Sequence, residues 1–278
     1  MNSATSRRTF LGATAALAAA SRAGFGATTE DPREFKIGVA TYSLRKFPRA
    51  QAIQMLKQLN VKYIDIKDVH LPLTSTPDEI KAARKEFEDA GFIIEGGGNV
   101  SFQKDDEADI RSKFEYAKLA GLPLIVCAPT HVTLPKMEKY VKEYNIKIAL
   151  HNHGPEDKHF PTPQSVLDAV KDMDPRCGLC MDIGHSARTG VDIVESVRQA
   201  GSRLLSMHTK DLADSTAKGS QCDVGDGVLP IVGLFRQLRK MNYTGGVMLE
   251  YEIHDTDPMM GMQKSLAYER GVAAALRG

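Results

Sequence analysis

Short apolar runs that alternate with longer stretches of helical periodicity are the feature that most constrains how this chain can fold. The runs recur at about the length of a strand–helix unit and lie at residues 37–40, 63–66, 92–94, 123–127, 146–150, 178–181, 204–207 and 246–249. Parallel strands joined by crossover helices require this spacing. Such a pattern over roughly 250 residues is typical of a single (β/α)₈ TIM barrel, with a doubly wound open sheet as the alternative.

Proline and glycine mark the ends of several expected helices. Pro77 opens a helix that Gly91 ends, and a helix over residues 108–120 is followed by Gly121. The last helix covers residues 259–276, and others begin at Pro135, Pro163 and Pro230. Gly96-Gly97-Gly98 follows the third run and is interpreted as a loop that lets a substrate approach closely. No linker or internal repeat interrupts the pattern, so residues 28–278 are expected to form one domain.

Polar and ionisable side chains gather at the carboxyl ends of these runs. They are Lys67, His70, Glu95, His151, Asn152, His153, Asp182, His185, His208, Lys210, Asp211, Glu250 and Glu252. Barrel enzymes place their active sites at this end of the strands. A single histidine or glutamate has an ordinary structural explanation, but several consecutive strands that end in such residues indicate a site.

Four of these residues are predicted to hold one divalent metal ion, namely His151, Asp182, His208 and Glu250. Two imidazoles and two carboxylates suit Mn²⁺, Zn²⁺, Co²⁺ or Fe²⁺ better than the all-oxygen sites of Mg²⁺ or Ca²⁺. Residues two apart on a strand share a face. His153 and Glu252 should therefore point the same way as His151 and Glu250, but from nearer the surface.

The remaining candidates divide into groups that act on the substrate and groups that bind it. The catalytic candidates are His153, Glu95 and Glu252 as alternative bases, Lys210 as a cation for a negative substrate oxygen, and His185, which can reach the substrate or a second metal. Substrate contacts are expected from Lys67, His70, Asn152 and Asp211.

The amino-terminal residues have the features of an export signal. Arg7 and Arg8 precede an alanine-rich apolar stretch, and no acidic residue occurs before Glu30. A basic start followed by a short apolar run is typical of a signal peptide, and paired arginines resemble the twin-arginine type. We expect residues 1–27 to be this signal and the remaining chain to be periplasmic or extracellular.

Charge and cysteine content narrow the classes of partner. Without residues 1–27 the chain keeps 33 basic and 35 acidic residues, a net charge of −2. Such a surface gives no electrostatic reason to expect nucleic acid or stable membrane insertion, and a homodimer stays open. Cys177 and Cys180 form a CxxC without a second CxxC, which favours core-facing sulfurs over a zinc site.

Several motifs resemble the sugar phosphate isomerase/epimerase family, the xylose isomerase-like barrels that also include endonuclease IV. They are His-Asn-His-Gly at 151–154, Met-Asp-Ile-Gly-His at 181–185, His-Thr-Lys-Asp at 208–211, Val-Gly-Asp-Gly at 224–227 and Leu-Glu-Tyr-Glu at 249–252. The resemblance implies that Asp182, His208 and Glu250 are metal ligands and that the partner is a small carbohydrate substrate. Where the family commonly has a glutamate ligand this chain has His151, a departure that leaves a less anionic site and a less secure paired-glutamate mechanism.

The leading hypothesis is a metal-dependent sugar isomerase or epimerase that works through an enediolate. A lyase or dehydratase on a keto-sugar or keto-glycoside begins with the same removal of an α proton and then expels a β leaving group. Export favours this second hypothesis, the lyase or dehydratase, because sugar phosphates are scarce outside the cytoplasm. An endonuclease IV-like phosphodiesterase would need more metal ligands and a basic surface, and a non-catalytic sugar-binding barrel would not need to keep all four ligands.

Overall fold

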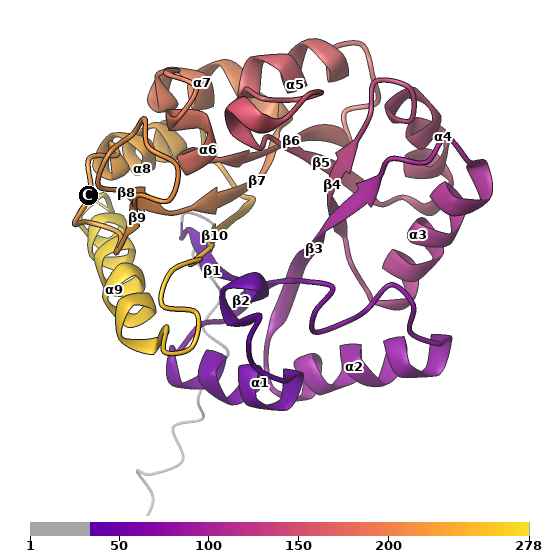
Figure 1. Cartoon of the computed structure of the whole chain (residues 1–278), viewed down its shortest axis with the longest axis horizontal. Helices are drawn as coiled ribbons and strands as arrows, with labels where there is room; N and C mark the ends of the chain where they lie inside the picture. The colour runs from indigo at the N-terminus through magenta and orange to yellow at the C-terminus, as the bar shows by residue number, and fades with distance from the viewer. Residues whose placement is uncertain (1–33, 278) are drawn as a thin grey trace, which may run out of the picture. The chain divides into compact units, whose positions relative to one another are not determined.

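The computed structural model describes residues 34–277 of the chain, and these form a closed parallel barrel (Figure 1). Its strands are β1 (Lys36–Ala40), β2 (Tyr63–Ile66), β3 (Ile93–Phe102), β4 (Leu124–Pro129), β5 (Lys147–His151), β6 (Cys177–Asp182), β7 (Leu204–Thr209) and β10 (Gly246–Leu249). Neighbouring strands pair in parallel around the ring, and β1 closes it by pairing with both β2 and β10. The predicted barrel is confirmed and the open sheet is excluded. The expected signal, residues 1–27, lies outside the described residues.

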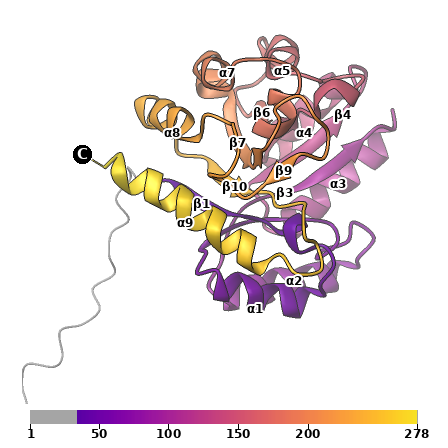
Figure 2. The ribbon, with the colours of Figure 1, turned by 60° about the vertical axis from the view of Figure 1, so that its left-hand side comes forward.

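The helices lie outside the ring of strands in both views (Figures 1 and 2). They are α1 (Arg49–Gln58), α2 (Pro77–Asp89), α3 (Glu107–Leu119), α4 (Leu134–Tyr144), α5 (Pro163–Val170), α6 (Ile183–Ala187), α7 (Ile193–Ala200), α8 (Ile231–Lys240) and α9 (Met259–Ala275). Short 3₁₀ turns occur at η1 (Thr41–Leu44), η2 (Gly154–Glu156) and η3 (Gly201–Arg203). Among the described residues, no helix is both long enough and apolar enough to cross a membrane.

Local capping explains why two helices begin where proline predicted them. Thr76 and Glu79 form a reciprocal capping box at the start of α2, and Thr162 with Ser165 does the same for α5. Each pair satisfies backbone N–H groups that have no partner within the helix. Pro occupies the first turn of both helices, where its missing N–H costs nothing.

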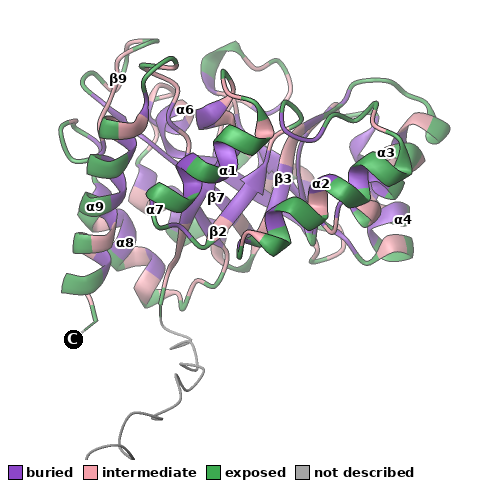
Figure 3. Cartoon of the chain, turned by 90° about the horizontal axis from the view of Figure 1, so that it is seen from below, coloured by how far each residue is buried: buried purple, intermediate pink, exposed green. Residues whose placement is uncertain are grey.

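The apolar core lies between the barrel and its helices, as the burial of the strands and the exposure of the outer helix faces show (Figure 3). A smaller apolar cluster fills part of the barrel interior and comprises Leu124, Val126, Ala149 and Cys180. Cys177 and Cys180 are buried and free, in agreement with the sequence interpretation.

Strand β3 differs from the prediction because it continues to Phe102, well beyond the apolar run. The glycines at 96–98 belong to this strand and not to a loop. A Cβ atom at Gly98, whose φ is +140°, would lie 2.0 Å from the carbonyl oxygen of Val126, so this position requires glycine. The register with β4 shifts between Gly97 and Val100, and the Gly98–Asn99 peptide bond is cis.

Two short strands follow β7 and form a separate antiparallel pair. They are β8 (Asp211–Leu212) and β9 (Gln221–Cys222). The side chain of Gln221 donates to the carbonyl of Glu250 and accepts from the amide of Glu252. This pair therefore holds the segment that follows β10 at the carboxyl end of the barrel.

Candidate metal centre

The four proposed metal ligands lie at the carboxyl ends of four strands that are adjacent in the ring. His151 ends β5, Asp182 ends β6, His208 is the penultimate residue of β7, and Glu250 directly follows β10. Asp182 is in register with His208, and the amide of Glu250 extends the ladder by donating to the carbonyl of Thr209. The barrel register thus brings the four side chains together.

Their donor atoms lie within 4.8 Å of one another. Nε2 of His151 is 3.0 Å from Nδ1 of His208 and 3.7 Å from Oδ2 of Asp182. Nδ1 of His208 is 3.4 Å from Oε2 of Glu250. The other oxygen of Asp182 accepts the amide of His185 and caps α6, which leaves Oδ2 facing the cluster.

These four side chains fit a divalent transition-metal ion. An ion about 2.1 Å from each of two donors separates those donors by roughly 3 to 4 Å, which matches the distances above. Oδ2 of Asp182 is buried and makes no hydrogen bond, and its ion-pair partner Lys210 leaves lone pairs of the carboxylate available for an ion. The mixed nitrogen and oxygen set suits Mn²⁺, Zn²⁺, Co²⁺ or Fe²⁺.

Protonation at neutral pH suits coordination by His151 and Glu250. Burial, together with the neighbouring His208 and His153, lowers the pKa of His151 well below its usual value, so its imidazole is neutral. Burial works against ionisation of Glu250, but Lys210 and His208 outweigh it and hold the pKa of that carboxyl well below its usual range. A neutral imidazole and an ionised carboxylate are the forms that bind metals. His208 differs, because burial opposes its charge but Cys180, Glu250 and Asp65 outweigh burial and raise its pKa well above the usual value. A bound ion would therefore displace a proton from His208.

Lys210 lies between the carboxylates of the cluster. Its Nζ is 2.8 Å from Oε2 of Glu250, 2.6 Å from Oε2 of Glu252, and 2.9 Å from Oδ2 of Asp182. Burial opposes the charge, but the three carboxylates outweigh it and raise the pKa of Lys210 well above its usual value. Lys210 is therefore a permanent cation that shares two oxygens with the proposed metal site.

A cavity of about 260 Å³ opens beside the ligands. His151 and Glu250 line it together with Tyr42, Lys67, Asn99, His153, His185 and Glu252. Sequence reasoning had named Lys67, His153, His185 and Glu252, and the structure brings all four to this cavity. Its polar lining and moderate volume match a small polyhydroxylated ligand better than a polymer.

His153 is held on both sides of its ring. Nε2 lies 2.9 Å from the side-chain amide nitrogen of Asn99, and Nδ1 lies 3.4 Å from Oδ2 of Asp157. With the Asn99 amide as donor, neutral His153 carries its proton on Nδ1 and its lone pair on Nε2. Burial opposes ionisation of Asp157, but His153 and two backbone amides lower the pKa of that carboxyl to about 2, so it remains a carboxylate that orients the ring.

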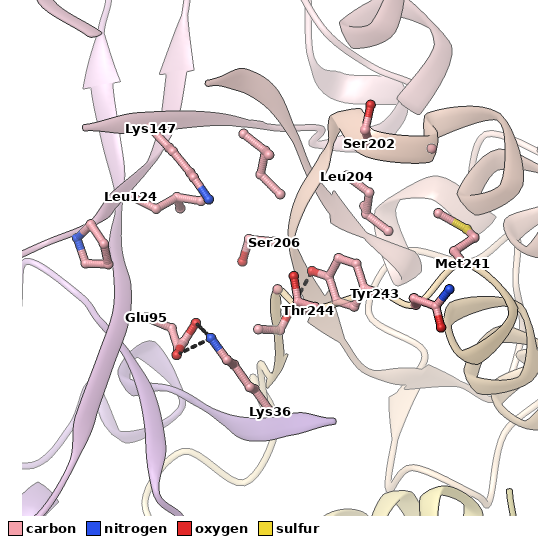
Figure 4. Close-up of a pocket in the computed structure, with 16 residues that line it drawn as sticks. Lys36, Glu95, Leu124, Lys147, Ser202, Leu204, Ser206, Met241, Tyr243 and Thr244 are labelled. Atoms are coloured by element: carbon pink, nitrogen blue, oxygen red, sulfur yellow. Dashed lines mark hydrogen bonds and ion pairs between the residues drawn. The ribbon is translucent and has the colours of Figure 1, made fainter. Parts of the chain in front are cut away.

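Glu95 is not at this site, which corrects one expectation. Because β3 runs to Phe102, Glu95 lies near the start of that strand. It forms an ion pair with Lys36 at the first residue of β1, and both line a separate cavity of about 710 Å³ at the amino end of the barrel (Figure 4). Glu95 therefore cannot act as a base in the cavity beside the ligands.

Three residues predicted to contact the substrate, His70, Asn152 and Asp211, make hydrogen bonds within the protein instead. His70 is buried and its Nε2 pairs with the carbonyl of Phe47. The amide of Asn152 bridges β5 and β6, donating to Ser186 and accepting the backbone amide of Asp182. With these contacts, neither His70 nor Asn152 lines the cavity beside the ligands.

Asp211, the third residue predicted to contact the substrate, holds a loop instead. Its carboxylate accepts hydrogen bonds from a set of backbone amides, those of Leu212, Gly225, Gly227 and Leu229. The side chain thus fixes the loop that carries the Val-Gly-Asp-Gly motif and does not line the cavity.

The sequence reasoning missed four residues, namely Tyr42, Asn99, Asp157 and Asp65. Tyr42 and Asn99 line the cavity, Asp157 orients His153, and Oδ2 of Asp65 lies 3.8 Å from Nε2 of His208. Asp65 carried a readable signal, since it is an acidic residue within an apolar run.

Comparison with known proteins agrees with this geometry. The xylose isomerase-like TIM barrel family matches residues 17–272. The chain belongs to that family. Solved structures of similar fold include a D-psicose 3-epimerase in the presence of D-fructose (17% identity, TM-score 0.68, 86% of this chain and 99% of that one). The IolI protein with a bound zinc atom is also similar (16% identity, TM-score 0.73, 87% and 99%).

Among curated proteins, inosose dehydratase of Mesomycoplasma hyopneumoniae strain 7448 is 26% identical over 159 residues. The match covers 50% of this chain and 52% of the relative, so the chain spans about half the length of the curated relatives it matches. The structural likenesses establish the barrel, and the membership establishes a family that includes sugar-processing enzymes.

Proposed function

We propose that this protein is a divalent-metal-dependent sugar isomerase or epimerase that moves a proton at a carbon next to a carbonyl. The observation that carries the proposal is a buried four-donor cluster beside a cavity lined by two further proton-transfer groups, His153 and Glu252. These two groups follow β5 and β10, which are not neighbours in the ring. They can therefore approach a bound sugar from different sides.

His153 is the group best prepared to remove the proton. Asp157 holds its Nδ1–H, so the ring presents a lone pair at Nε2, and a substrate C–H would replace the Asn99 amide at that position. Glu252 on the other side, after taking a proton from solvent, can deliver it to the opposite face of the same carbon in epimerisation or to the adjacent carbon in isomerisation. Lys210 lies against Glu252 and provides fixed positive charge where negative charge develops on the sugar oxygens.

His151, Asp182, His208 and Glu250 would hold the ion. When bound, the ion supplies a Lewis acid that stabilises negative charge on adjacent sugar oxygens. We place D-ketoses and keto-sugars first among candidate substrates, because the cavity is small and polar.

Elimination from a keto-sugar is the second candidate, and the likeness to inosose dehydratases favours it. The first step is the same removal of an α proton by His153. The second group then protonates a departing β hydroxyl or glycosidic oxygen instead of carbon. The two reactions thus share every residue named above and differ in where the second proton goes.

The deciding experiment measures metal content and turnover on the same samples. The purified protein, reconstituted separately with Mn²⁺, Zn²⁺, Co²⁺ and Fe²⁺, is incubated in D₂O with a panel of ketoses, inososes and 3-keto-glycosides, and the products are followed by NMR. Isomerisation or epimerisation introduces deuterium and keeps the composition of the sugar. Elimination releases water or an aglycone.

Variants identify the site. His151→Ala and Glu250→Ala should each lose the metal and the activity, whereas Glu95→Gln, which alters a carboxylate at the opposite end of the barrel, should keep both. A wild-type protein that binds none of these metals, or His151→Ala and Glu250→Ala variants that keep full metal content, would contradict the proposed centre.

We also propose that the protein is exported through the twin-arginine route. The support is the sequence of residues 1–27, with Arg7 and Arg8 ahead of an apolar stretch. In a bacterial host with this pathway, the wild-type chain should accumulate outside the cytoplasm in a shortened form. An Arg7→Lys, Arg8→Lys double variant should stay inside at full length, and equal distribution of the two proteins would refute the proposal.

A further inference from the structure

Asp65 on β2 is a buried acid without a hydrogen-bond partner. Its side chain is 3% exposed, and neither carboxylate oxygen makes a hydrogen bond. It is not among the residues that line the cavity at the amino end or the one beside the ligands, so neither cavity supplies it with solvent. An isolated buried carboxylate is costly, which indicates that the residue serves a purpose.

The polar group that faces Asp65 belongs to a proposed metal ligand. Oδ2 of Asp65 is 3.8 Å from Nε2 of His208, and that nitrogen is also buried without a hydrogen bond. The other ring nitrogen, Nδ1, faces His151 and Glu250. His208 therefore lies between the metal-ligand cluster on one side and Asp65 on the other.

The neighbouring strand leaves room for the Asp65 carboxylate. Asp65 is in register with Gly96 of β3. A Cβ atom at Gly96 would lie 3.0 Å from Oδ1 of Asp65, closer than ordinary contacts allow. The glycine thus permits a carboxylate to occupy the barrel interior behind His208.

Other nearby groups are poorer partners for these atoms. The hydroxyl of Tyr243, which senses the charge of Asp65, donates to the carbonyl of Gly246 instead. The thiol of Cys180 also lies close to His208, but sulfur is a weak acceptor. The carboxylate is the strongest acceptor available to Nε2.

We propose that Asp65 is a positioning residue that accepts the Nε2–H of His208 and thereby keeps the lone pair of Nδ1 directed at the metal. A movement of about 1 Å brings the pair to hydrogen-bond distance. Carboxylates in this position fix the tautomer and orientation of metal-binding histidines and raise their basicity. The inference rests on the metal centre of the proposed function but not on the reaction that the protein catalyses.

The test uses Asp65→Asn and Asp65→Leu, with Cys180→Ala as the matched control for the competing acceptor. The tautomer of His208 is read from imidazole ¹⁵N shifts in metal-free protein, assigned by comparison with His208→Gln. The spectra are recorded over a pH series that extends to the neutral imidazole, because the pKa of His208 is raised. Affinity for Mn²⁺ and Zn²⁺ is read by competition with a chromogenic chelator. Wild type and Cys180→Ala should show the Nε2–H tautomer, and both Asp65 variants should bind metal roughly 10- to 100-fold more weakly.

Wild-type affinity and an unchanged tautomer in either folded Asp65 variant would overturn the proposal, as would a larger effect of Cys180→Ala. Asp65→Asn keeps the size of the side chain, so it decides the matter if Asp65→Leu does not fold. The tautomer is measured without metal or substrate. A protein that binds no metal would therefore refute the proposed function, while the ¹⁵N spectrum would still report on Asp65.

Discussion

Glu269 provides a quantitative prediction about how stability depends on pH. It lies on α9, is fully buried, and neither of its carboxylate oxygens makes a hydrogen bond. Burial raises its pKa from 4.5 to about 7, against smaller opposing effects of Thr209 and Arg270. The folded protein therefore holds a proton on Glu269 at pH values where the unfolded chain has already released it.

The sign follows from proton binding. Between the two pKa values the folded state binds more protons than the unfolded state, so the free energy of unfolding falls as pH rises. The contribution is fully present below pH 4.5 and is lost as pH passes about 7. At about 1.4 kcal/mol for each tenfold change in the equilibrium, the total is on the order of 3 kcal/mol.

Glu269→Gln replaces the carboxyl with an amide that does not titrate. Relative to wild type, the variant should gain on the order of 2 to 3 kcal/mol of stability between pH 5 and pH 8. Urea unfolding followed by circular dichroism at both pH values, with a chelator present, measures this difference, and the slopes with urea should agree. Asp172→Asn, at an exposed position, serves as the control and should show no such gain. A difference between Glu269→Gln and wild type that does not change with pH would refute the reasoning.

Three further predictions concern the metal centre and its base. Mn²⁺ at 100 times its dissociation constant should stabilise the wild type by about 2.7 kcal/mol, seen as a higher Tm, and His151→Ala should abolish that shift. Lys210→Met removes a cation that lies 2.8 Å from Glu250 and should strengthen Mn²⁺ binding at least about tenfold, because like charges no longer share the same oxygens; unchanged or weaker binding in competition titrations would contradict this. Asp157→Asn should lower kcat roughly 10- to 100-fold with little change in KM, because His153 loses the carboxylate that fixes its tautomer. Steady-state kinetics on the substrate found in the screen measure both constants, and a kcat equal to that of the wild type would contradict the prediction.

The sequence predicts the metal-ligand side chains because strand ends can be located from apolar runs. His151, Asp182, His208 and Glu250 each stand where a run stops, and a parallel barrel places all such ends on one face. The fold follows for the same reason, since period and spacing are properties of the chain alone. The position of a ligand in the sequence does not determine the orientation of its side chain. That orientation depends on contacts such as the hydrogen bond between Asp182 and the backbone amide of His185 at the start of α6.

The errors arise where tertiary contacts override local preference. Glycine weakens strands, so the third strand was expected to end before residues 96–98; in the structure, pairing with β2 and β4 carries it on to Phe102. Because the end of the strand was predicted too early, Glu95 was assigned to the site and Asn99 was not. His70 and Asp211 were assigned to substrate because nothing in the sequence shows which backbone groups a polar side chain will meet after folding.

The Asp211 carboxylate has a consequence for how this barrel can diversify. By binding amides at both ends of the segment from Leu212 to Leu229, it closes that segment into a loop anchored at its base. Apart from Gln221, which is hydrogen-bonded to the backbone of Glu250 and Glu252, most of the intervening residues can change without altering this anchor. Selection can then alter the length and composition of the rest of this loop while the Asp211 anchor and the ligand-bearing strands keep their positions.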